Sequence, residues 1–342
     1  MSYFKKNKKG ALLLFLLGMI AALSTVVAAI IFYASRIMAS KASDMLESPL
    51  RAEAYSALYA AVAELEELYS IDGGFYSEAQ GWGECFKSGR VALPGGSDVE
   101  VKVSDMQGKI SISGISISDY KKILEELGFT ELEAAVLGDC YFDWIDSDNA
   151  VSGEGAEMDD YPDGAPKPPN RPLESFGEFR RIKGYAEIMF NPDSTPTELY
   201  QTFTRIFSLE TFSGVNLNSA SSEVLELLCN ISEVDFDPLM HDAVRGEGVP
   251  LSDGISWVKN AGELRERGCE PPARNAEYKT GMIKIEVRAK RGAAEFFLSA
   301  IYSNSLSEPA PADKTAIGRP EQTFETASGF KLVRILERQE PN

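Results

Sequence analysis

Histidine is almost absent from this chain: His241 is the only one in 342 residues, and no two cysteines have the spacing Cys-x-x-Cys. Zinc ribbons, thioredoxin-like redox motifs and His-rich metal sites are therefore excluded, and a histidine-dependent catalytic triad is disfavoured. Basic charge is also scarce, because 34 Lys and Arg stand against 52 Asp and Glu and leave a net charge of −18. A protein that binds DNA or RNA without regard to sequence needs a basic face, so this composition argues against nucleic acid as a partner.

The four cysteines are widely separated in the sequence, at Cys85, Cys140, Cys229 and Cys269. Outside the cytoplasm they can form disulfides, but four cysteines allow three connectivities and their spacing does not choose among them. Cys140 has apolar neighbours in the sequence and is expected in the core. No group of residues predicts catalytic chemistry, so the sequence favours a protein that is not an enzyme.

What the sequence does have is a long uncharged segment near its start. Residues 11–35 carry no charge, and lysines precede them at four of the positions 5–9. As a helix, about 24 such residues span roughly 36 Å, which is enough to cross the core of a bilayer. Lysines on the N-terminal side keep that side in the cytoplasm, which predicts a single pass through the inner membrane with the C-terminal body in the periplasm. A cleaved secretory signal and a plain signal anchor are the alternatives.

Apolar residues continue past this segment with helical spacing, at steps of three and four residues over 46–69. Together the two parts predict one helix over 11–70, on the order of 88 Å long, which the Gly73-Gly74 pair ends. Pro49 interrupts the pattern and is expected to kink this helix. An anchor followed by a separate amphipathic helix is the alternative interpretation.

Strand and helix patterns follow one another along the remaining chain. Strands are expected over 99–103, 110–113, 278–288, 294–302 and 331–336, with a loop over 303–329. The first two strands are separated by turn-forming residues and are expected to form a hairpin. The order of patterns predicts an α+β fold, in which the long helix packs on an antiparallel sheet formed by 71–115 and 275–342. A mostly helical domain is expected as an insertion at 116–274.

One segment of the inserted domain is similar to the start of a helix–hairpin–helix module. Over 214–228, Asn218 or Ser219 is the expected helix cap, and Glu223 lies in the first turn. DNA-binding versions of the module offer the backbone amides of a Gly-rich hairpin to phosphate, and no Gly-x-Gly follows here. The surrounding sequence is acidic, so helix packing is favoured over DNA binding.

Acidic residues concentrate in one stretch: 123–166 contains thirteen Asp and Glu and no Lys or Arg. Calcium takes six to eight oxygen ligands, and the glycines at 153 and 155 let the loop wrap around an ion. The spacing of three acidic residues matches an EF-hand frame, but the centre of the loop does not, so this is not an EF-hand. The candidate ligands of calcium are Asp146, Asp148, Glu157 and Asp159, followed by Asp143 and Asp160. An exposed acidic turn without an ion is the alternative.

The junction Lys8-Lys9-Gly10-Ala11 before the apolar helix resembles the leader of type IV pilins and pseudopilins. In those families a prepilin peptidase cuts after the glycine and methylates the new N-terminus, so the resemblance implies cleavage between Gly10 and Ala11. Most such subunits have Glu as the fifth mature residue, where it pairs with the N-terminal amine of a neighbour. Here that position is Phe15. A subunit without this Glu resembles the K-type minor pseudopilin of type II secretion systems, which occupies the tip of the filament.

Further motifs of the K-type family occur in order along the chain. They are the turn at 108–113, Asp143-Trp144-Ile145-Asp146, the acidic loop at 155–161, the Pro/Asn-rich link at 162–172, the segment 173–184 and the helix start at 216–228. The first Asn-Leu-Asn of the family pattern is missing, and Met158 is inserted before the aspartates of the loop. The resemblance implies calcium bound in the helical domain. It also implies a tip complex with I-type and J-type minor pseudopilins that helps to initiate assembly and export across the outer membrane.

Two other functions remain open at this point. A membrane-anchored periplasmic calcium-binding protein or enzyme is compatible with the same anchor and acidic loop. A DNA-binding pilin of the competence type would need a basic patch, which the sequence does not show.

Overall fold

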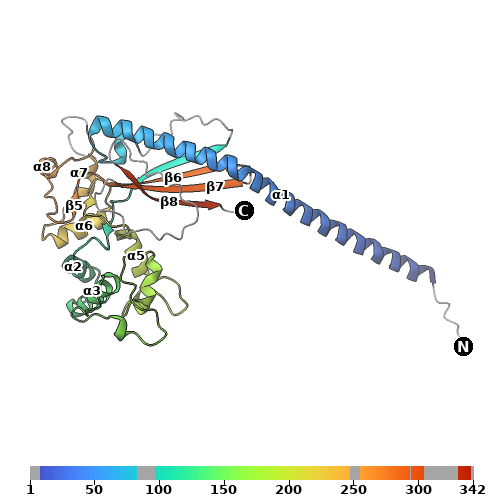
Figure 1. Ribbon diagram of the computed structural model, residues 1–342, viewed down its shortest axis with the longest axis horizontal. Helices are drawn as coiled ribbons and strands as arrows, with labels where there is room; N and C mark the ends of the chain where they lie inside the picture. The colour runs from blue at the N-terminus through green and yellow to red at the C-terminus, as the bar shows by residue number, and fades with distance from the viewer. Residues whose placement is uncertain (1–7, 83–96, 247–254, 293, 304–329, 340–342) are drawn as a thin grey trace.

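The longest element is the N-terminal helix α1 (Lys8–Asp72), which extends away from the rest of the molecule (Figure 1). The computed structural model describes residues 8–82, 97–246, 255–292, 294–303 and 330–339; residues 1–7, Cys85 and nearly all of the expected loop over 303–329 lie outside them. The single helix expected over 11–70 is confirmed. It continues through Pro49, and Gly73 ends it in the left-handed region with φ = 72°.

The N-terminal half of α1 contains an apolar segment that none of the described residues covers. Its segment Phe15–Tyr33 has a mean hydropathy of 2.6 and none of it is buried. Among the described residues this is the one helix that is long and apolar enough to cross a membrane. Because an isolated chain in water would not leave such a face exposed, the segment is suited to a bilayer or to other apolar helices.

The C-terminal half of α1 packs on the sheet because one of its faces is apolar. The side chains of that face recur every three or four residues and are at most 3% exposed: Leu50, Ala54, Ala57, Leu58, Ala61 and Leu65. They form one core with inward-facing residues of the sheet, among them Ile285, Val287 and Leu298. Burial of apolar area at about 25 cal/mol per Å² is the main force that holds the helix on the sheet.

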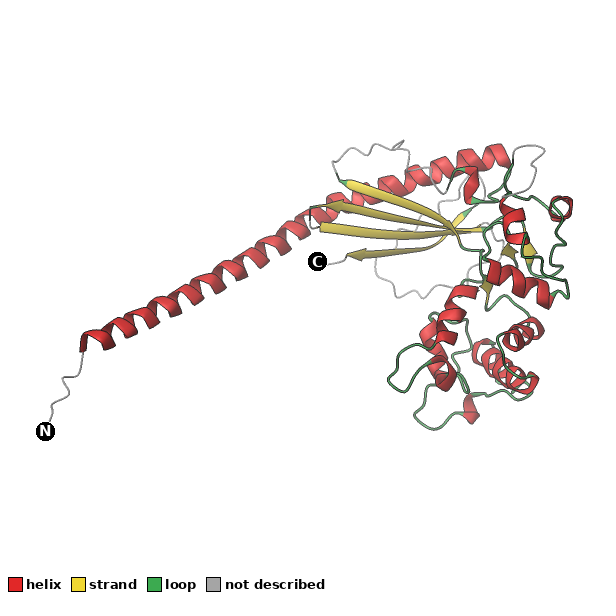
Figure 2. Cartoon of the chain, turned by 180° about the vertical axis from the view of Figure 1, so that it is seen from behind, coloured by secondary structure: helices red, strands yellow, loops and turns green. Residues whose placement is uncertain are grey.

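The sheet has four antiparallel strands in the order β1-β6-β7-β8. Their bounds are β1 (Asp98–Asp105), β6 (Met282–Arg291), β7 (Ala294–Ser303) and β8 (Lys331–Gln339). The chain leaves the sheet after β1 and returns in β6, which is the neighbouring strand. The inserted domain therefore begins and ends at the same end of the sheet, away from the N-terminus (Figure 2).

The hairpin expected from 99–103 and 110–113 is wrong. β1 pairs with β6, whereas β2 (Ile110–Ser111) pairs in parallel with β3 (Phe207–Ser208). The physical reason is that the two alternating segments serve different cores. β1 packs beneath α1, while Ile110 and Ile112 are buried in the core of the inserted domain.

The inserted domain consists of short helices around a core of its own. Its helices are α2 (Ile117–Glu126), α3 (Glu131–Ile145), α4 (Ala186–Met189), α5 (Glu198–Ile206), α6 (Ser222–Ile231), α7 (Met240–Arg245) and α8 (Ala261–Glu266). Short 3₁₀ turns also occur in it, at η2 (Met158–Asp160) and η3 (Phe176–Arg181), and β4 (Val215–Asn216) pairs with β5 (Ala276–Glu277). A further 3₁₀ turn, η1 (Glu78–Gln80), follows α1 and lies before β1. The molecule is thus an α+β protein with an antiparallel sheet and a mostly helical insertion, as the sequence predicts.

The N-terminal cap of α6 lies two to three residues later than the expected Asn218 or Ser219. Ser221 caps the helix, because its hydroxyl accepts the N–H of Val224, and Glu223 lies in the first turn as expected. Asn218, one of the two expected caps, is instead buried. Its side chain binds the backbone of Val258 and Tyr278 and so joins separate segments of the inserted domain.

A partly buried carboxylate connects the sheet with the inserted domain. The carboxylate of Asp105, at the end of β1, accepts hydrogen bonds from Asn216 Nδ2 at 2.7 Å and Ser219 Oγ at 2.6 Å, and from the backbone N–H of Gln107. Asn216 Nδ2 also donates to the carbonyl of Tyr76. Burial raises the pKa of Asp105, and these hydrogen bonds oppose the rise.

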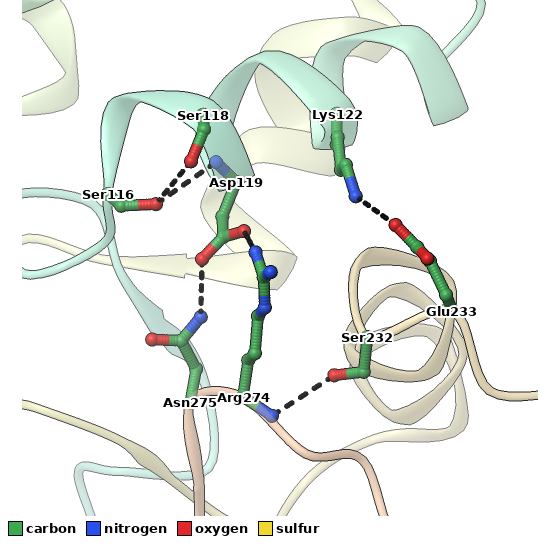
Figure 3. A network of polar contacts seen from close by, with 8 residues as sticks. All are labelled: Ser116, Ser118, Asp119, Lys122, Ser232, Glu233, Arg274 and Asn275. Atoms are coloured by element: carbon green, nitrogen blue, oxygen red, sulfur yellow. Dashed lines mark hydrogen bonds and ion pairs between the residues drawn. The ribbon is translucent and has the colours of Figure 1, made fainter.

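A second polar network ties α2 to the segment that returns to the sheet (Figure 3). Asp119, in the first turn of α2, is 5% exposed and accepts hydrogen bonds from Arg274 Nη1 at 3.0 Å and Asn275 Nδ2 at 3.2 Å. Lys122 of the same helix forms an ion pair with Glu233 just after α6. These contacts connect α2, α6 and the chain that leads to β5.

Candidate functional site

The candidate site begins on α3, which is a well-capped helix. Thr130 accepts the N–H of Glu133, and the Glu133 carboxylate accepts the N–H of Thr130 in return. Asp139 and Asp143 are four residues apart and therefore lie on the same face of this helix. Both are buried, at 5% and 0% exposure. Asp146 follows at the C-terminal cap.

The acidic loop returns across this face of α3 and is held there by backbone hydrogen bonds. The N–H of Ser152 donates to Asp143 at 3.2 Å, and the N–H of Glu154 donates to Asp139 at 3.2 Å. A side chain at position 153 or 155 would collide with one of these two carboxylates, which explains the two glycines of the loop. Gly153 also has φ = 51°, which favours glycine.

Three carboxylates meet where the loop ends. Asp143, Asp146 and Glu157 each place an oxygen within 4.8 Å of the others. Glu157 is only 3% exposed and lies at the N-terminal cap of η2, and no side chain among the described residues donates a hydrogen bond to its carboxylate. Burial raises the pKa of Glu157 and of Asp146, and the negative charge of Asp143 adds to the rise in both.

This donor set fits a hard divalent cation. Buried charged groups are paired or bind metal in folded proteins, and Glu157, with two further carboxylates beside it, has no cationic side chain as a partner among the described residues. Carboxylate oxygen is the ligand that calcium prefers, and waters and backbone carbonyls usually complete its coordination. Asp143, Asp146 and Glu157 are the side chains that would hold the ion.

Of the four main ligands expected from the sequence, the structure brings two together and leaves two outside the group. Asp146 and Glu157 lie in the group of three, and they are joined by Asp143, which the sequence ranked below the main candidates. Asp148 lies beside the group, with its carboxylate accepting the N–H of Ala150. Asp159 is exposed in η2, and the Asp160 carboxylate accepts the N–H of Glu157.

Two carboxylates with a structural role were not singled out from the sequence, namely Asp139 beside the acidic group and Asp105 at the end of β1. Asp139 orients the acidic loop, and its spacing of four from Asp143 on an apolar helix was the available signal. Asp105 belongs to the turn-forming residues between the first two expected strands, and nothing local distinguishes its role in joining the sheet to the inserted domain. The other polar candidates have ordinary surroundings: His241 is partly exposed on α7 with Nδ1 3.3 Å from Asp242, and Cys140, Cys229 and Cys269 are buried free thiols.

The residues named for processing and assembly all lie on α1. Gly10 and Ala11 are in its first turns, and Phe15 opens the exposed apolar segment with 66% of its surface accessible. This placement is compatible with a membrane helix that begins near the expected cleavage point.

Comparison with known proteins connects this architecture to a family. Residues 104–191, which include α2, α3 and the acidic loop, match the family model of the type II secretion system (T2SS), protein K. The type II secretion system protein K of Pseudomonas aeruginosa is 24% identical over 176 residues, which are 48% of this chain. The chain spans about half the length of that relative, 50% of which is covered.

A solved structure has a similar fold. It is a chain in the crystal structure of the GspK–GspI–GspJ complex from the type 2 secretion system of enterotoxigenic Escherichia coli. The match has a TM-score of 0.57 at 12% identity and covers 88% of this chain and 100% of that one. The matched domain and the named relative make this chain similar to protein K of the type II secretion system, and the solved structure shows that the fold is shared.

Proposed function

We propose that this chain is the tip subunit of a type II secretion pseudopilus, where it helps to initiate filament assembly and thereby protein export across the outer membrane. The observation that carries the proposal is the division of the molecule along α1. The segment Phe15–Tyr33 of this helix is exposed and apolar, whereas its C-terminal part is packed on the sheet. The bulky inserted domain lies at the end of the sheet away from the membrane segment (Figure 1). A further subunit stacked beyond this end would meet that domain.

Membrane topology follows from the charge around the apolar segment. The lysines before residue 11 keep the N-terminus in the cytoplasm, so the sheet and the inserted domain lie in the periplasm. The leader would be removed between Gly10 and Ala11 by a prepilin peptidase, which methylates the new N-terminus. Mass spectrometry of the mature N-terminus tests this step, with methylated Ala11 as the expected result. Gly10→Leu should leave the leader attached, and normal processing of that variant would contradict the proposal.

The expected partners are other minor pseudopilins of the I and J types. The solved structure of similar fold is a complex of GspK with GspI and GspJ, which supports an assembly of the same kind here. Co-expression with the I-type and J-type subunits of the same organism, followed by extraction from membranes, should give one complex with one copy of each. Several copies of this chain per complex would contradict the tip position.

Calcium is proposed as a structural cofactor of the inserted domain. A bound cation would offset the repulsion among Asp143, Asp146 and Glu157 and would hold the loop on α3. Binding to the folded state alone adds RT ln(1 + [L]/Kd), about 2.7 kcal/mol at one hundred times Kd. The full chain in detergent should therefore melt at a higher temperature in calcium than in EDTA. The double variant Asp146→Ala, Glu157→Ala should lose this difference, and a wild-type protein that is indifferent to calcium would contradict the site.

A membrane-anchored calcium-binding protein that never enters a filament is the second candidate, and the acidic group favours it equally. The two functions differ at the N-terminus. An intact lysine leader and a chain that extracts from membranes alone would support this second candidate over the pseudopilin.

A further inference from the structure

Asp139 is a buried carboxylate beside the candidate cation site, but it is not one of the three proposed ligands. Its Oδ1 lies 2.6 Å from Lys121 Nζ, and the side chains of Lys121 and Asp139 are 27% and 8% exposed. The lysine comes from α2 and crosses α3 at Gly138, where a Cβ would approach its Cγ to 2.7 Å. Glycine in the middle of a helix is unfavourable by itself, so this position is explained by the passage of the lysine.

The second oxygen of Asp139 faces the acidic loop. It accepts the N–H of Glu154, while Asp143, one helical turn later, accepts the N–H of Ser152. Two N–H groups of the loop, two residues apart, are thus held by two carboxylates on one face of α3. The loop continues from Glu154 to Glu157 within three residues, so its attachment at Asp139 determines where Glu157 enters the group.

We propose that Asp139 is a positioning residue of the cation site, which docks the acidic loop on α3 and so places Glu157 opposite Asp143 and Asp146. Both of its oxygens are engaged, one by the lysine and one by the loop, so it does not bind the ion itself. Lys121 neutralises its charge, which keeps Asp139 from adding to the repulsion among the ligands. This inference rests on the cation site proposed above.

The test measures calcium affinity of the full chain in detergent by titration calorimetry. Residues that orient metal ligands typically change affinity about 10- to 100-fold when mutated, and Asp139→Ala is expected to weaken binding within this range. Asp139→Asn keeps an oxygen that accepts the N–H of Glu154 and should restore most of the affinity.

Asp119→Ala is the matched control. Asp119 is as buried as Asp139 and also forms an ion pair with a basic side chain. Its partners are Arg274 and Asn275, neither of which belongs to the acidic loop (Figure 3). Both alanine variants should lower the melting temperature, whereas only Asp139→Ala should change the affinity for calcium. An equal loss of affinity in the two variants would indicate general loosening of the domain and would overturn the proposal.

Hydrogen exchange in EDTA supplies a readout without the ion. Asp139→Ala should accelerate exchange of the Glu154 amide more than that of the Ser152 amide, which Asp143 still holds. Unchanged exchange at Glu154, or unchanged calcium affinity in a folded Asp139→Ala protein, would overturn the positioning role alone. A wild-type chain that binds no calcium would overturn the cation site and this role with it.

Discussion

At the scale of single residues, Glu157 is the most unusual side chain in the described structure. It is a nearly fully buried carboxylate to which no side chain of the described residues donates a hydrogen bond, and two further carboxylates lie beside it. An unpartnered buried charge destabilises the folded state, and the raised pKa of Glu157 expresses the same cost. The residue is therefore expected to destabilise the protein without a cation and to stabilise it with one.

Glu157→Gln tests this reversal. In EDTA the variant should melt at a higher temperature than the wild type, by the equivalent of about 1–3 kcal/mol, because a buried charge is replaced by a neutral amide. In calcium the order should be inverted, because a ligand is lost. Glu154→Gln is the control, since Glu154 belongs to the same loop but its side chain is exposed. A lower melting temperature of Glu157→Gln in both conditions would show that the carboxylate has a partner other than a cation.

At the scale of elements, α1 is one helix with two different surroundings. Its segment Phe15–Tyr33 is apolar and exposed, whereas its C-terminal part completes the core beneath the helix. Leu58 is 1% exposed in that core, while its neighbour Tyr59 is 46% exposed and has its ring 6.2 Å from that of Tyr55. Because of this difference in burial, alanine at the two positions is expected to affect stability unequally. Leu58→Ala should lower the free energy of unfolding by about 2–5 kcal/mol, as measured in urea from tryptophan fluorescence, to which the buried Trp82 contributes, and Tyr59→Ala should lower it less. Equal effects would mean that the packing of α1 on the sheet differs from that described.

The elements also show how far the sequence leads. The bounds of α1 follow from local patterns, namely an apolar period and a terminating glycine. The partners of β1 and β2 do not, because each pairs with a strand far along the chain and short loops favour hairpins by default. At the site, spacing identified Asp146 and Glu157. Asp143, and not Asp159, joins the group because the returning loop packs on the face of α3 that carries Asp143. This is a contact between segments that local sequence patterns do not predict.

At the scale of the whole molecule, the exposed apolar segment Phe15–Tyr33 of α1 is suited to contact with lipid or other apolar helices. Phe15 is the first residue of this segment. A charge inserted at the centre of a membrane helix costs about 2.5–3.5 kcal/mol on insertion scales, and less near the interface. If no subunit stacks above this one, no additional amine is available to pair with a carboxylate at this position. Phe15→Glu should therefore reduce recovery of the complex with I-type and J-type subunits, whereas Phe15→Leu should not. Increased incorporation of Phe15→Glu along filaments would overturn the tip position.

The entry and exit of the inserted domain at neighbouring strands has a consequence for the order of folding. Pairing β1 with β6 closes a loop of about 175 residues, which costs on the order of 5 kcal/mol in chain entropy if that loop is unstructured. A domain that has already folded brings Asp105 and Met282 together, since Met106 N–H bonds to the carbonyl of Met282 and Asn216 to Asp105. The inserted domain is thus expected to fold before the sheet, and a chain emerging from the membrane would acquire its pilin-like sheet last. Pulse-labelling hydrogen exchange during refolding should show protection of α3 and α6 before protection of β6 and β7.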